Sequence, residues 1–564
     1  MKQDQFRDYI GKRLVNAGII TEAQLEEALR IHNLKKGDKG LLGQTLVKMG
    51  FCTEEDIAKV VAERAGVPFV SLEGYPIDPA AMATISADAA KRYRALPLAF
   101  SDDKLVVAME RPTDILALDD LRILTGFDVR PVVVPDSELE EAIKRYSQAS
   151  VGVEQSVEEE PQHLDTGVSP SEEPGDKPAV HLANLIITHA VNAGASDVHI
   201  ELYEKALRVR FRLDGVLHDM MQPPRKIHAS LVSRIKVMAN MDIAEKRIPQ
   251  DGRMTLKVEG RNIDIRVASL PASYGERLTL RLLDRSSRMI TLEELGVASE
   301  TLEKYKKTIQ LPYGFILVTG PTGSGKSTTL YASLAAVDRS SKNVITIEDP
   351  VEYRIDRVNQ VQINPKAGLT FASGLRSILR SDPDIIMVGE IRDRETAAIA
   401  IESALTGHLV FSSMHTNDAA GAISRLAEME IEPYLTASSL ACVLAQRLAR
   451  VLCPHCREPY TITRQEAERI PDLPLEEKEE AITLFRANPR GCMRCSNTGF
   501  RGRVGIYELL LVTETIQKLT LERKSAREIK EAAVSEGMVT LRQDGMYKVR
   551  RGVTSLEEVM RVIV

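Results

Sequence analysis

Tryptophan is absent from this chain of 564 residues, and aromatic residues make up only 4% of it. Proteins that hold single-stranded nucleic acid need aromatic side chains on which the bases stack, spread along a basic groove. The formal net charge of −6 likewise provides no broad attraction to a phosphate backbone. These absences argue against a protein that works on nucleic acid.

Long apolar runs and cysteines are also scarce. No stretch approaches the ~18 consecutive apolar residues that a transmembrane helix needs, and the N-terminus MKQDQFRDYIGKRL lacks the apolar core of a signal peptide. Six cysteines in a chain of this length do not suggest a disulfide scaffold. We therefore expect a cytoplasmic protein without a transmembrane segment, and the length predicts about three or four domains.

One acidic segment, residues 151–178, contains almost nothing from which a core can be built. Its sequence, VGVEQSVEEEPQHLDTGVSPSEEPGDKP, holds eight carboxylates, one lysine and four prolines. Such a composition cannot offset the entropy that is lost on ordering. We predict an acidic flexible linker over residues 147–178, and the alternative is an acidic binding segment.

The region before the linker contains an internal repeat. Ile10–Leu29, IGKRLVNAGIITEAQLEEAL, aligns with Leu42–Val61, LGQTLVKMGFCTEEDIAKVV, at a constant offset of 32 residues. In each copy an apolar helical pattern meets a glycine, and Thr21 or Thr53 follows as the expected N-cap of a second helix. The repeat therefore predicts two short helix pairs within residues 1–66.

The rest of the chain has the pattern of an α/β protein. Residues 67–146 mix strands and helices, with strands expected at KLVVAME and DVRPVVV. In residues 179–300, strands such as LRVRFRLDG and NIDIRVASL alternate with helices. From residue 301 to 564, short apolar strands alternate with helices, which is typical of an α/β nucleotide-binding core.

The stretch GPTGSGKSTTL follows the apolar run FILVT and satisfies the pattern G-x-x-x-x-G-K-[ST] between a strand and a helix. Glycines let backbone amides close around phosphates, Lys326 places a positive charge near the β- and γ-phosphate oxygens, and Ser327 offers a hydroxyl ligand to Mg²⁺. The loop therefore predicts binding of a nucleoside triphosphate with Mg²⁺. The residues expected to bind the nucleotide are Gly320, Pro321, Thr322, Gly323, Ser324, Gly325, Lys326, Ser327 and Thr328.

Hydrolysis also needs acids at strand ends that hold the metal and orient water. The strand in VITIEDPVEY ends in Glu348 and Asp349, and the strand in DPDIIMVGEIRD ends in Glu390. Gly389 occupies the place where a metal-linked aspartate often lies. We predict that Glu390 organises metal and water and that Glu348 orients the attacking water, with the reverse assignment as one alternative. The other alternative is that both acids only solvate strand ends.

A third strand, within LTGHLVFSSMHTNDA, is flanked by His408 and His415. A histidine beside a strand is usually structural, and this is the alternative interpretation. Because the strand belongs to the expected nucleotide-binding core, we predict that His415 senses the γ-phosphate.

Four of the cysteines form two C-x₂-C knuckles, Cys453 with Cys456 and Cys492 with Cys495, separated by 35 residues. Four thiolates give a closed tetrahedral site, which suits structural Zn²⁺ and leaves no position for catalysis. We predict a zinc-binding insertion at about residues 451–500, with free thiols as the alternative. A zinc ribbon that binds nucleic acid is disfavoured, because the intervening EAERIPDLPLEEKEE is strongly acidic.

The motifs GPTGSGKST, TIEDPVEY, SDPDIIMVGEIRD and TGHLVFSSMHTNDA occur in this order. They resemble the Walker A, Asp box, Walker B and His box of the type II/type IV secretion ATPase superfamily. The resemblance continues upstream in ASDVHIELYEKALRVRFRLDGVL, SRIKVMANMDIAEKRIPQDGRM and YGERLTLRLL, and downstream in GCMRCSNTGFRGRVGIYELL. It is strong over about residues 180–510 and is greatest toward pilus-extension motors and their type II secretion counterparts.

The resemblance implies a homohexameric cytoplasmic ATPase, docked on an inner-membrane platform protein, that hydrolyses ATP to assemble pilin subunits. It implies a RecA-like P-loop ATPase domain at residues 301–564, with the zinc insertion and C-terminal helices. A PAS-like domain at 179–300 and an N-terminal helical-repeat plus α/β domain at 1–146 would precede it. A type II secretion motor is the alternative, and a nucleic-acid-translocating ring ATPase is a distant one. Retraction motors of this superfamily usually lack both the N-terminal region and the cysteine cluster.

The N-terminal repeat resembles a domain that binds cyclic di-GMP in some members of the superfamily. Those members use an arginine immediately before the Leu-Gly pair of each repeat. The corresponding positions here are Tyr9 and Leu41, and the first pair reads Ile10-Gly11. We therefore favour protein docking for this domain, with cyclic di-GMP binding as the alternative.

Arg277 and Arg281 lie four residues apart in YGERLTLRLL. In a strand these positions face the same side, so both guanidinium groups can reach one phosphate. Some phosphate-loop enzymes recruit such a cation to stabilise the charge of the transition state. We predict that both arginines act in catalysis, and the alternative is that they pair with acids such as Glu276 or Asp284.

Overall fold

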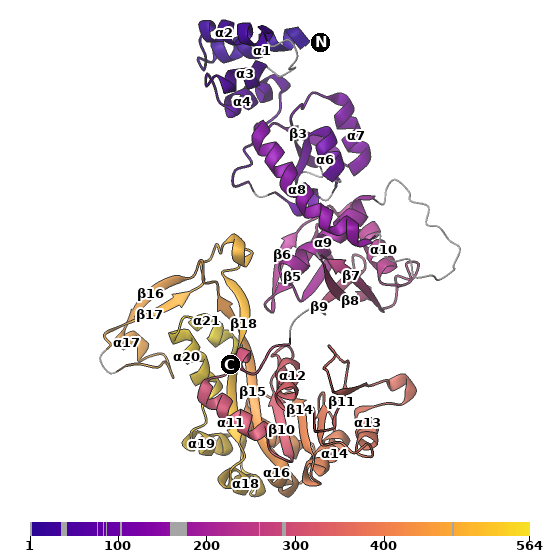
Figure 1. The fold of residues 1–564 in the computed structure, drawn as a ribbon, viewed down its shortest axis with the longest axis vertical. Coiled ribbons are helices and arrows are strands. Elements are labelled where there is room, and N and C mark those ends of the chain that lie inside the picture. The colour runs from indigo at the N-terminus through magenta and orange to yellow at the C-terminus, as the bar shows by residue number, and fades with distance from the viewer. Residues whose placement is uncertain are drawn as a thin grey trace. The chain divides into compact units, whose positions relative to one another are not determined.

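The computed structural model describes residues 3–563 with the exception of 35–41, 76, 83, 86, 102–103, 158–176, 259, 285–288 and 477–478. The chain forms two compact units, Met1–Ser286 and Ser287–Val564 (Figure 1). The α/β fold class predicted from the sequence is confirmed. The finer division at residues 146, 178 and 300 stays a proposal, and the separate hydrophobic cores described below support it.

The first unit begins with the helical repeat. The Thr53 hydroxyl accepts the backbone N–H of Asp56, and the Asp56 carboxylate accepts the N–H of Thr53, so the expected N-cap is confirmed. Thr21 and Gln24 exchange the same two hydrogen bonds before the second helix. The four helices are α1 (Gln3–Asn16), α2 (Glu22–Leu34), α3 (Leu42–Lys48) and α4 (Glu54–Ala65).

One glycine of each repeat lies where two helices approach closely. A Cβ built on Gly11 would lie 2.4 Å from Leu25 Cδ1, and one built on Gly43 would lie 2.9 Å from Ile57 Cδ1. These two contacts are equivalent under the 32-residue offset of the repeat. Close helix packing therefore explains the glycine of each Ile-Gly or Leu-Gly pair.

A small α/β region follows, with a three-stranded sheet in the order β1-β2-β3. Strand β1 pairs antiparallel with β2, and β2 pairs parallel with β3. Leu96, Leu105 and Leu121 are fully buried in a core that belongs to this region. Its elements are α5 (Pro79–Met82), α6 (Ala87–Tyr93), β1 (Ala95–Ser101), β2 (Lys104–Met109), α7 (Ile115–Thr125), β3 (Asp128–Val132) and α8 (Asp136–Val157).

Two of the sequence predictions fall wholly or partly outside the described residues. Helix α8 ends at Val157 and the next helix begins at Lys177, and residues 158–176 of the predicted acidic linker lie outside the described part. Leu41 and the side chain of Tyr9, which bear on cyclic di-GMP binding, lie outside it as well.

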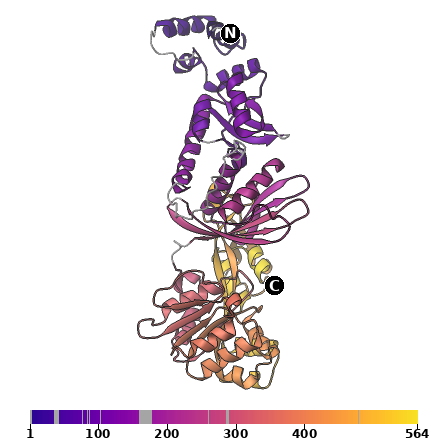
Figure 2. The ribbon, with the colours of Figure 1, turned by 90° about the vertical axis from the view of Figure 1, so that its right-hand side faces the viewer.

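The remainder of the first unit is a six-stranded antiparallel sheet with the order β6-β5-β4-β9-β8-β7. Figure 2 shows the sheet with its helices on one face. Alternation along β4 directs Val198 and Ile200 into the core beneath the helices and leaves Asp197, His199 and Glu201 on the other face. The elements are α9 (Lys177–Asn192), β4 (Asp197–Leu202), β5 (Leu207–Leu213), β6 (Val216–Met221), η1 (Arg225–Ile227), α10 (His228–Met238), β7 (Gln250–Val258), β8 (Arg261–Leu270) and β9 (Arg277–Asp284).

The second unit is built around a seven-stranded sheet with the order β12-β11-β13-β14-β10-β15-β18. Pairing is parallel from β12 to β15, whereas β18 runs antiparallel to β15. The strands are β10 (Gly314–Thr319), β11 (Val344–Glu348), β12 (Asn359–Gln362), β13 (Ile385–Val388), β14 (Leu409–Met414), β15 (Leu440–Leu452) and β18 (Phe500–Leu511). Parallel strands covered on both faces need nearly continuous apolar runs, and β10, β13 and β14 are buried at every position.

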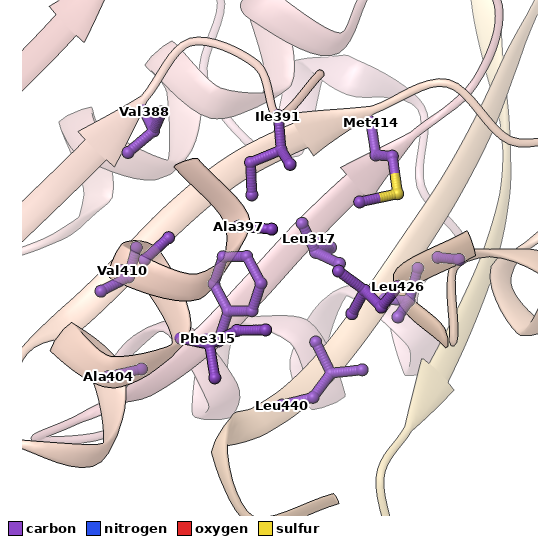
Figure 3. Packing of buried hydrophobic residues seen from close by; sticks show 14 of the residues in the cluster. Phe315, Leu317, Val388, Ile391, Ala397, Ala404, Val410, Met414, Leu426 and Leu440 are labelled. Atoms are coloured by element: carbon purple, nitrogen blue, oxygen red, sulfur yellow. The ribbon is translucent and has the colours of Figure 1, made fainter. Parts of the chain in front are cut away.

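Alternate residues of β10 face two separate cores. Phe315 and Leu317 lie in the core beneath α13 to α16 (Figure 3), and Ile316 and Val318 lie in the core beneath α11 and α12. Helices on both faces of a mostly parallel sheet make the RecA-like core that the sequence predicted. These elements are η2 (Glu293–Leu295), α11 (Ser299–Ile309), α12 (Lys326–Ala336), η3 (Pro365–Ala367), α13 (Phe371–Ile378), α14 (Arg394–Leu405), α15 (Ala419–Glu428) and α16 (Pro433–Ser439).

The C-terminal part adds the cysteine insertion and the last helices. Between the two cysteine knuckles, β16 and β17 pair antiparallel, so the chain of the insertion folds back on itself. The elements are β16 (Glu458–Thr463), α17 (Arg464–Ala467), β17 (Ala481–Arg486), η4 (Met493–Cys495), α18 (Glu514–Leu521), α19 (Ala526–Ser535), α20 (Leu541–Arg550) and α21 (Leu556–Val562). Within the described ranges, no helix combines the length and apolarity that crossing a membrane requires.

Candidate functional site

The predicted motifs meet at one edge of the seven-stranded sheet. The phosphate loop follows β10, Glu348 is the last residue of β11, Glu390 comes just after β13, and His415 directly follows β14. These four strands are parallel neighbours in the order β11-β13-β14-β10, so their carboxyl ends share one edge. The Gly320 N–H donates to the Met414 carbonyl at 3.3 Å, which places the start of the loop beside His415.

Two glycines give the phosphate loop its shape. Gly320 has a φ of 151°, and a Cβ there would lie 2.5 Å from both the Gln446 carbonyl oxygen and Ser324 Oγ. Gly325 has a φ of 90° and is the left-handed N-cap residue of α12. A side chain at either position would be strained or would clash. The loop therefore turns directly into α12, whose first backbone N–H groups lack helical acceptors and suit a phosphate.

Lys326 contacts neutral groups at this edge. Its Nζ donates to the Gly320 carbonyl at 2.9 Å and to the Pro321 carbonyl at 3.2 Å. Burial lowers the pKa of Lys326 to about 8, the nearby Glu390 opposes this shift, and Arg447 adds to it. Among the described residues the ammonium forms no salt bridge with a carboxylate, so an anionic ligand can take the place of the two carbonyls.

Glu390 and His415 are in contact with one another. His415 Nε2 lies 3.5 Å from Glu390 Oε2, and Arg392 Nη2 lies 2.5 Å from Glu390 Oε1. The side chain of Glu390 is 16% exposed, so solvent reaches part of it. Ser327, the predicted Mg²⁺ ligand, is exposed in the first turn of α12. The structure thus brings Lys326, Glu390 and His415 together around the phosphate loop.

Glu348 lies in a different environment. It is buried, and three side chains donate to its carboxylate: Tyr331 to Oε2, Thr346 to Oε1 at 2.5 Å, and Gln360 to Oε1 at 3.1 Å. These three donors occupy most of the roughly four acceptor positions of the carboxylate, so little of it is left for an attacking water molecule. Glu390 has the more open geometry of the two, and the roles of both residues stay predictions.

The two predicted catalytic arginines lie in the first unit, on the face of its sheet that carries no helix. Arg277 Nη2 pairs with Glu201 Oε1 at 2.8 Å, and Arg281 Nε pairs with Asp197 Oδ1 at 3.1 Å. Strands β9 and β4 are antiparallel neighbours, with Arg281 opposite Asp197. Acidic partners are therefore present, but they come from the adjacent strand rather than from residues next to the arginines in sequence.

Each of these carboxylates also holds a second arginine. Arg210 Nη2 lies 2.5 Å from Glu201 Oε2, and Arg212 Nε lies 3.4 Å from Asp197 Oδ2. Both carboxylates are buried. Four guanidinium groups thus share two carboxylates, and this face keeps an excess of positive charge.

The four cysteines of the two knuckles lie together. The Sγ–Sγ distances are 3.8 Å for Cys453 with Cys492, 3.8 Å for Cys456 with Cys495, and 3.7 Å for Cys492 with Cys495. All four sulfurs lie within 4.8 Å of one another. A tetrahedron with Zn–S bonds of about 2.3 Å has S–S edges of about 3.8 Å, so the cluster fits Zn²⁺. Backbone N–H groups of Cys492 and Gly499 donate to Cys495 Sγ at 3.1 and 3.3 Å, which favours the thiolate.

Sequence reasoning missed two residues of β15 that lie at the phosphate loop. Gln446 is buried and donates to the loop through its side-chain amide, and Arg447 donates to the Asn417 carbonyl at 2.7 Å. Burial lowers the pKa of Arg447, against the opposing effect of Asp418 and Glu508. The only signal in the sequence was a polar pair inside the apolar run LACVLAQRLARVL.

Two family models match the chain. The model described as type II/IV secretion system protein matches residues 172–561. The model described as MshEN domain matches residues 65–153. The first match spans the six-stranded sheet and the seven-stranded sheet, and the second spans the small α/β region before them.

Relatives match over most of the chain. The type IV pilus assembly ATPase PilB of Myxococcus xanthus (strain DK1622) is 41% identical over 563 residues, which are 98% of this chain and 98% of that protein. The type II secretion system ATPase E of Vibrio cholerae serotype O1 is 50% identical over 406 residues, which are 72% of this chain and 78% of that protein. The solved structure of the pilus retraction motor PilT with bound ADP covers 67% of this chain and 95% of that chain, at 27% identity and a TM-score of 0.45. The phosphate loop, two acids and His415 gather at one sheet edge, and the family model over residues 172–561 together with the 41% identical relative shows that the chain belongs to the type II/type IV secretion ATPase family.

Proposed function

We propose that this chain is the ATPase motor that drives assembly of a type IV pilus. The observation that carries the proposal is the match to a pilus assembly ATPase along 98% of both chains, N-terminal region included. The type II secretion ATPase is more similar in sequence, at 50% identity, but it matches only 72% of this chain. A type II secretion motor is therefore the second candidate.

In this proposal the motor is a cytoplasmic homohexamer that binds a platform protein at the inner membrane. The two compact units of each chain rotate relative to one another as ATP is hydrolysed, and this rotation moves the platform. Their separate cores support such a motion, since units with cores of their own can move as rigid bodies. The helical repeat docks a protein partner, and the MshEN match beside it keeps cyclic di-GMP binding as the alternative.

Hydrolysis takes place at the phosphate loop. Backbone N–H groups of the loop and Lys326 bind the β- and γ-phosphates, and the phosphates replace the carbonyls that Lys326 contacts here. Ser327 would hold Mg²⁺, which would neutralise charge on the phosphates. The burial of Glu348 beneath three donors supports the reverse of the predicted roles, in which Glu390 orients the attacking water. His415, in contact with Glu390, senses the γ-phosphate.

The other predicted groups belong to the sheet of the first unit and to the cysteine insertion. Arg277 and Arg281 stabilise transition-state charge when the first unit approaches ATP, and they exchange their carboxylate partners for phosphate in doing so. Zn²⁺ held by the four cysteines would have a structural role and no catalytic one. It would hold the insertion to the end of β15. The excess positive charge on the arginine face supports the first role, and the tetrahedral spacing of the sulfurs supports the second.

The proposal can be tested in a strain whose own copy of the gene is deleted. We expect loss of surface pili with normal amounts of pilin, restored by the wild-type chain and not by Lys326→Ala. Lys307→Ala, which changes an exposed lysine of α11, is the matched control and should restore pili. Normal pili with a loss of type II secretion would identify the second candidate. Stimulation of ATP hydrolysis by single-stranded DNA would instead favour a nucleic-acid-translocating ring ATPase.

A further inference from the structure

Gln446 is a buried polar residue inside an otherwise apolar strand. It is 1% exposed. It directly follows Ala445, which pairs with Thr319 at the last position where β15 and β10 run side by side. Its side chain therefore lies where β10 passes into the phosphate loop. Burying an amide costs free energy unless its polar atoms find partners, so the partners of Gln446 indicate its role.

Both ends of the Gln446 amide are bound to the loop and its helix. Nε2 donates to the Ser324 carbonyl at 2.6 Å, and Oε1 accepts the hydroxyl proton of Thr329 at 2.8 Å. A carbonyl can only accept, so the amide nitrogen must face Ser324. Ser324 lies in the loop and Thr329 lies in the first turns of α12, and both are buried. The amide thus bridges the two sides of the turn at Gly325.

The backbone of Gln446 lies equally close to the loop. The Cβ built on Gly320 would lie 2.5 Å from the Gln446 carbonyl oxygen, and one built on Gly325 would lie 3.1 Å from Gln446 Nε2. The two glycines that shape the loop therefore both face this residue. Arg447 donates from Nη1 to the Gln446 carbonyl at 3.2 Å and from Nη2 to the Asn417 carbonyl at 2.7 Å, which joins the same strand to the turn after β14.

We propose that Gln446 is a positioning residue for nucleotide binding. Its side-chain amide fixes the phosphate loop in the shape that receives the β-phosphate, which ATP and ADP share. The residue touches neither the nucleotide nor the reacting atoms in this role. The inference rests on the assignment of nucleotide binding to this loop under the proposed function.

Gln446→Leu keeps most of the side-chain volume and removes both hydrogen bonds. The Ser324 carbonyl then loses its buried donor and the Thr329 hydroxyl keeps only its contact with Tyr507, which disfavours the present loop shape. We expect the affinity for ADP to fall about tenfold or more, and the KM for ATP to rise by a similar factor. The value of kcat at saturating ATP should stay within about threefold, because the amide acts on binding and not on the water.

Two further variants separate positioning from stability. Thr329→Val removes one of the two bonds and keeps the shape, so we expect a smaller loss of ADP affinity, about threefold. Ser333→Ala is the matched control: its buried hydroxyl also lies on α12, where it bonds the Tyr305 hydroxyl and the Thr329 carbonyl, away from the loop. We expect Ser333→Ala to lower the melting temperature and to leave ADP affinity unchanged. In the double variant Gln446→Leu/Thr329→Val, the two losses should be less than additive.

The measurement is binding of fluorescent ADP with Mg²⁺ to the full chain, with ATPase kinetics and circular dichroism on the same preparations. Wild-type affinity in both Gln446→Leu and Thr329→Val, beside lost affinity in Lys326→Ala, would overturn the positioning role alone. Wild-type affinity in Lys326→Ala as well would overturn the assignment of the loop itself. Should Gln446→Leu fail to fold, Thr329→Val decides, and wild-type ADP affinity in that variant overturns the inference.

Discussion

The two units hold their cations in different ways. On the sheet of the first unit, Arg277 and Arg281 each pair with a buried carboxylate that already holds another arginine. At the sheet edge of the second unit, Lys326 donates only to two backbone carbonyls. An arginine that leaves its partner gives up a salt bridge with a buried carboxylate, which keeps its second arginine, whereas Lys326 leaves two neutral carbonyls behind. The comparison teaches that Lys326 can bind an anion without breaking a salt bridge, whereas Arg277 and Arg281 would first have to give up their carboxylates.

The largest expected effect on ATP hydrolysis comes from Lys326, the cation whose hydrogen-bond partners are neutral carbonyls. Lys326→Ala removes the ammonium group of the phosphate loop, while Arg447 nearby stays bonded to the Gln446 and Asn417 carbonyls, so we expect kcat/KM for ATP to fall about 10³-fold or more. Phosphate release at steady state measures this, with Lys307→Ala as the control. Near-normal turnover in Lys326→Ala would show that Lys326 is not needed to bind the phosphates of ATP.

The next effect separates the two glutamates. Glu390→Gln and Glu348→Gln keep the side-chain shape and remove the charge, so we expect retained ATP binding and turnover slowed about 10²-fold. Glu348→Gln also turns an N–H₂ group toward donors such as Tyr331 and Thr346, so its free energy of unfolding should drop by about 1–3 kcal/mol. Single-turnover assays and thermal melts on purified variants measure both. Wild-type turnover in both variants would rule out the two assignments.

A smaller effect is expected at the arginine face. Arg277→Ala and Arg281→Ala should each lower ATPase activity about tenfold to hundredfold while leaving assembly and zinc content intact, because each removes a cation that a related enzyme class uses in the transition state. Arg208→Ala is the matched control, since Arg208 pairs with the exposed Asp219 and not with a buried carboxylate. Normal ATP hydrolysis in both variants would rule out a catalytic role for the two arginines. His415 would then be the next candidate for sensing the γ-phosphate.

The pH dependence of binding sharpens the comparison further. Because burial lowers the pKa of Lys326 to about 8, the free protein loses this charge as the pH rises through that value, and ADP affinity should fall by at most about tenfold per pH unit above it. The sign for stability is opposite. A lysine in the unfolded chain has a pKa of about 10.4, so between about pH 8 and this value the unfolded state binds more protons than the folded state. The contribution of Lys326 to the free energy of unfolding therefore rises with pH in this range. ADP binding across this range measures the first effect, and a Lys326→Arg variant should flatten it.

The smallest effect on the nucleotide site is expected from removal of zinc. We expect one zinc ion per chain, held by Cys453, Cys456, Cys492 and Cys495, and its removal should loosen the insertion, because structural zinc contributes directly to local folding. ADP affinity should stay unchanged. Metal analysis of protein prepared without chelator, with limited proteolysis before and after chelation, measures both. Purified protein that contains no zinc would contradict the proposed zinc site. A fall in ADP affinity on chelation would contradict the independence of the nucleotide site from zinc.

Features that depend on local sequence were predictable. The helix pairs, their threonine caps, the strand before the phosphate loop and the strand ends that carry Glu348, Glu390 and His415 all follow from short patterns. The cysteine spacing predicted the cluster of four sulfurs in the same way. These features need only a few neighbouring residues. The parallel sheet then brings the phosphate loop, the two glutamates and His415 to one edge.

Features that depend on distant partners were not predictable. The burial of Glu348 follows from donors on three different elements, and the partners of Arg277 and Arg281 follow from the antiparallel pairing of β9 with β4. Gln446 belongs to the loop only because β15 runs beside β10. Nothing in the residues around it marks that contact, since it is made across the sheet.

The position of β18 has a consequence for the newly made chain. Strand β15 ends at Leu452, its outer neighbour β18 begins at Phe500, and the cysteine insertion lies between them. As the chain leaves the ribosome, β15 therefore emerges well before the strand that covers its outer edge, and an open edge of this kind invites pairing with other chains. Cys453 follows β15 and Cys495 precedes β18, so a zinc ion bound by both would draw together the two ends that must pair. With zinc bound in this way, its supply during translation would set how long an aggregation-prone edge stays open.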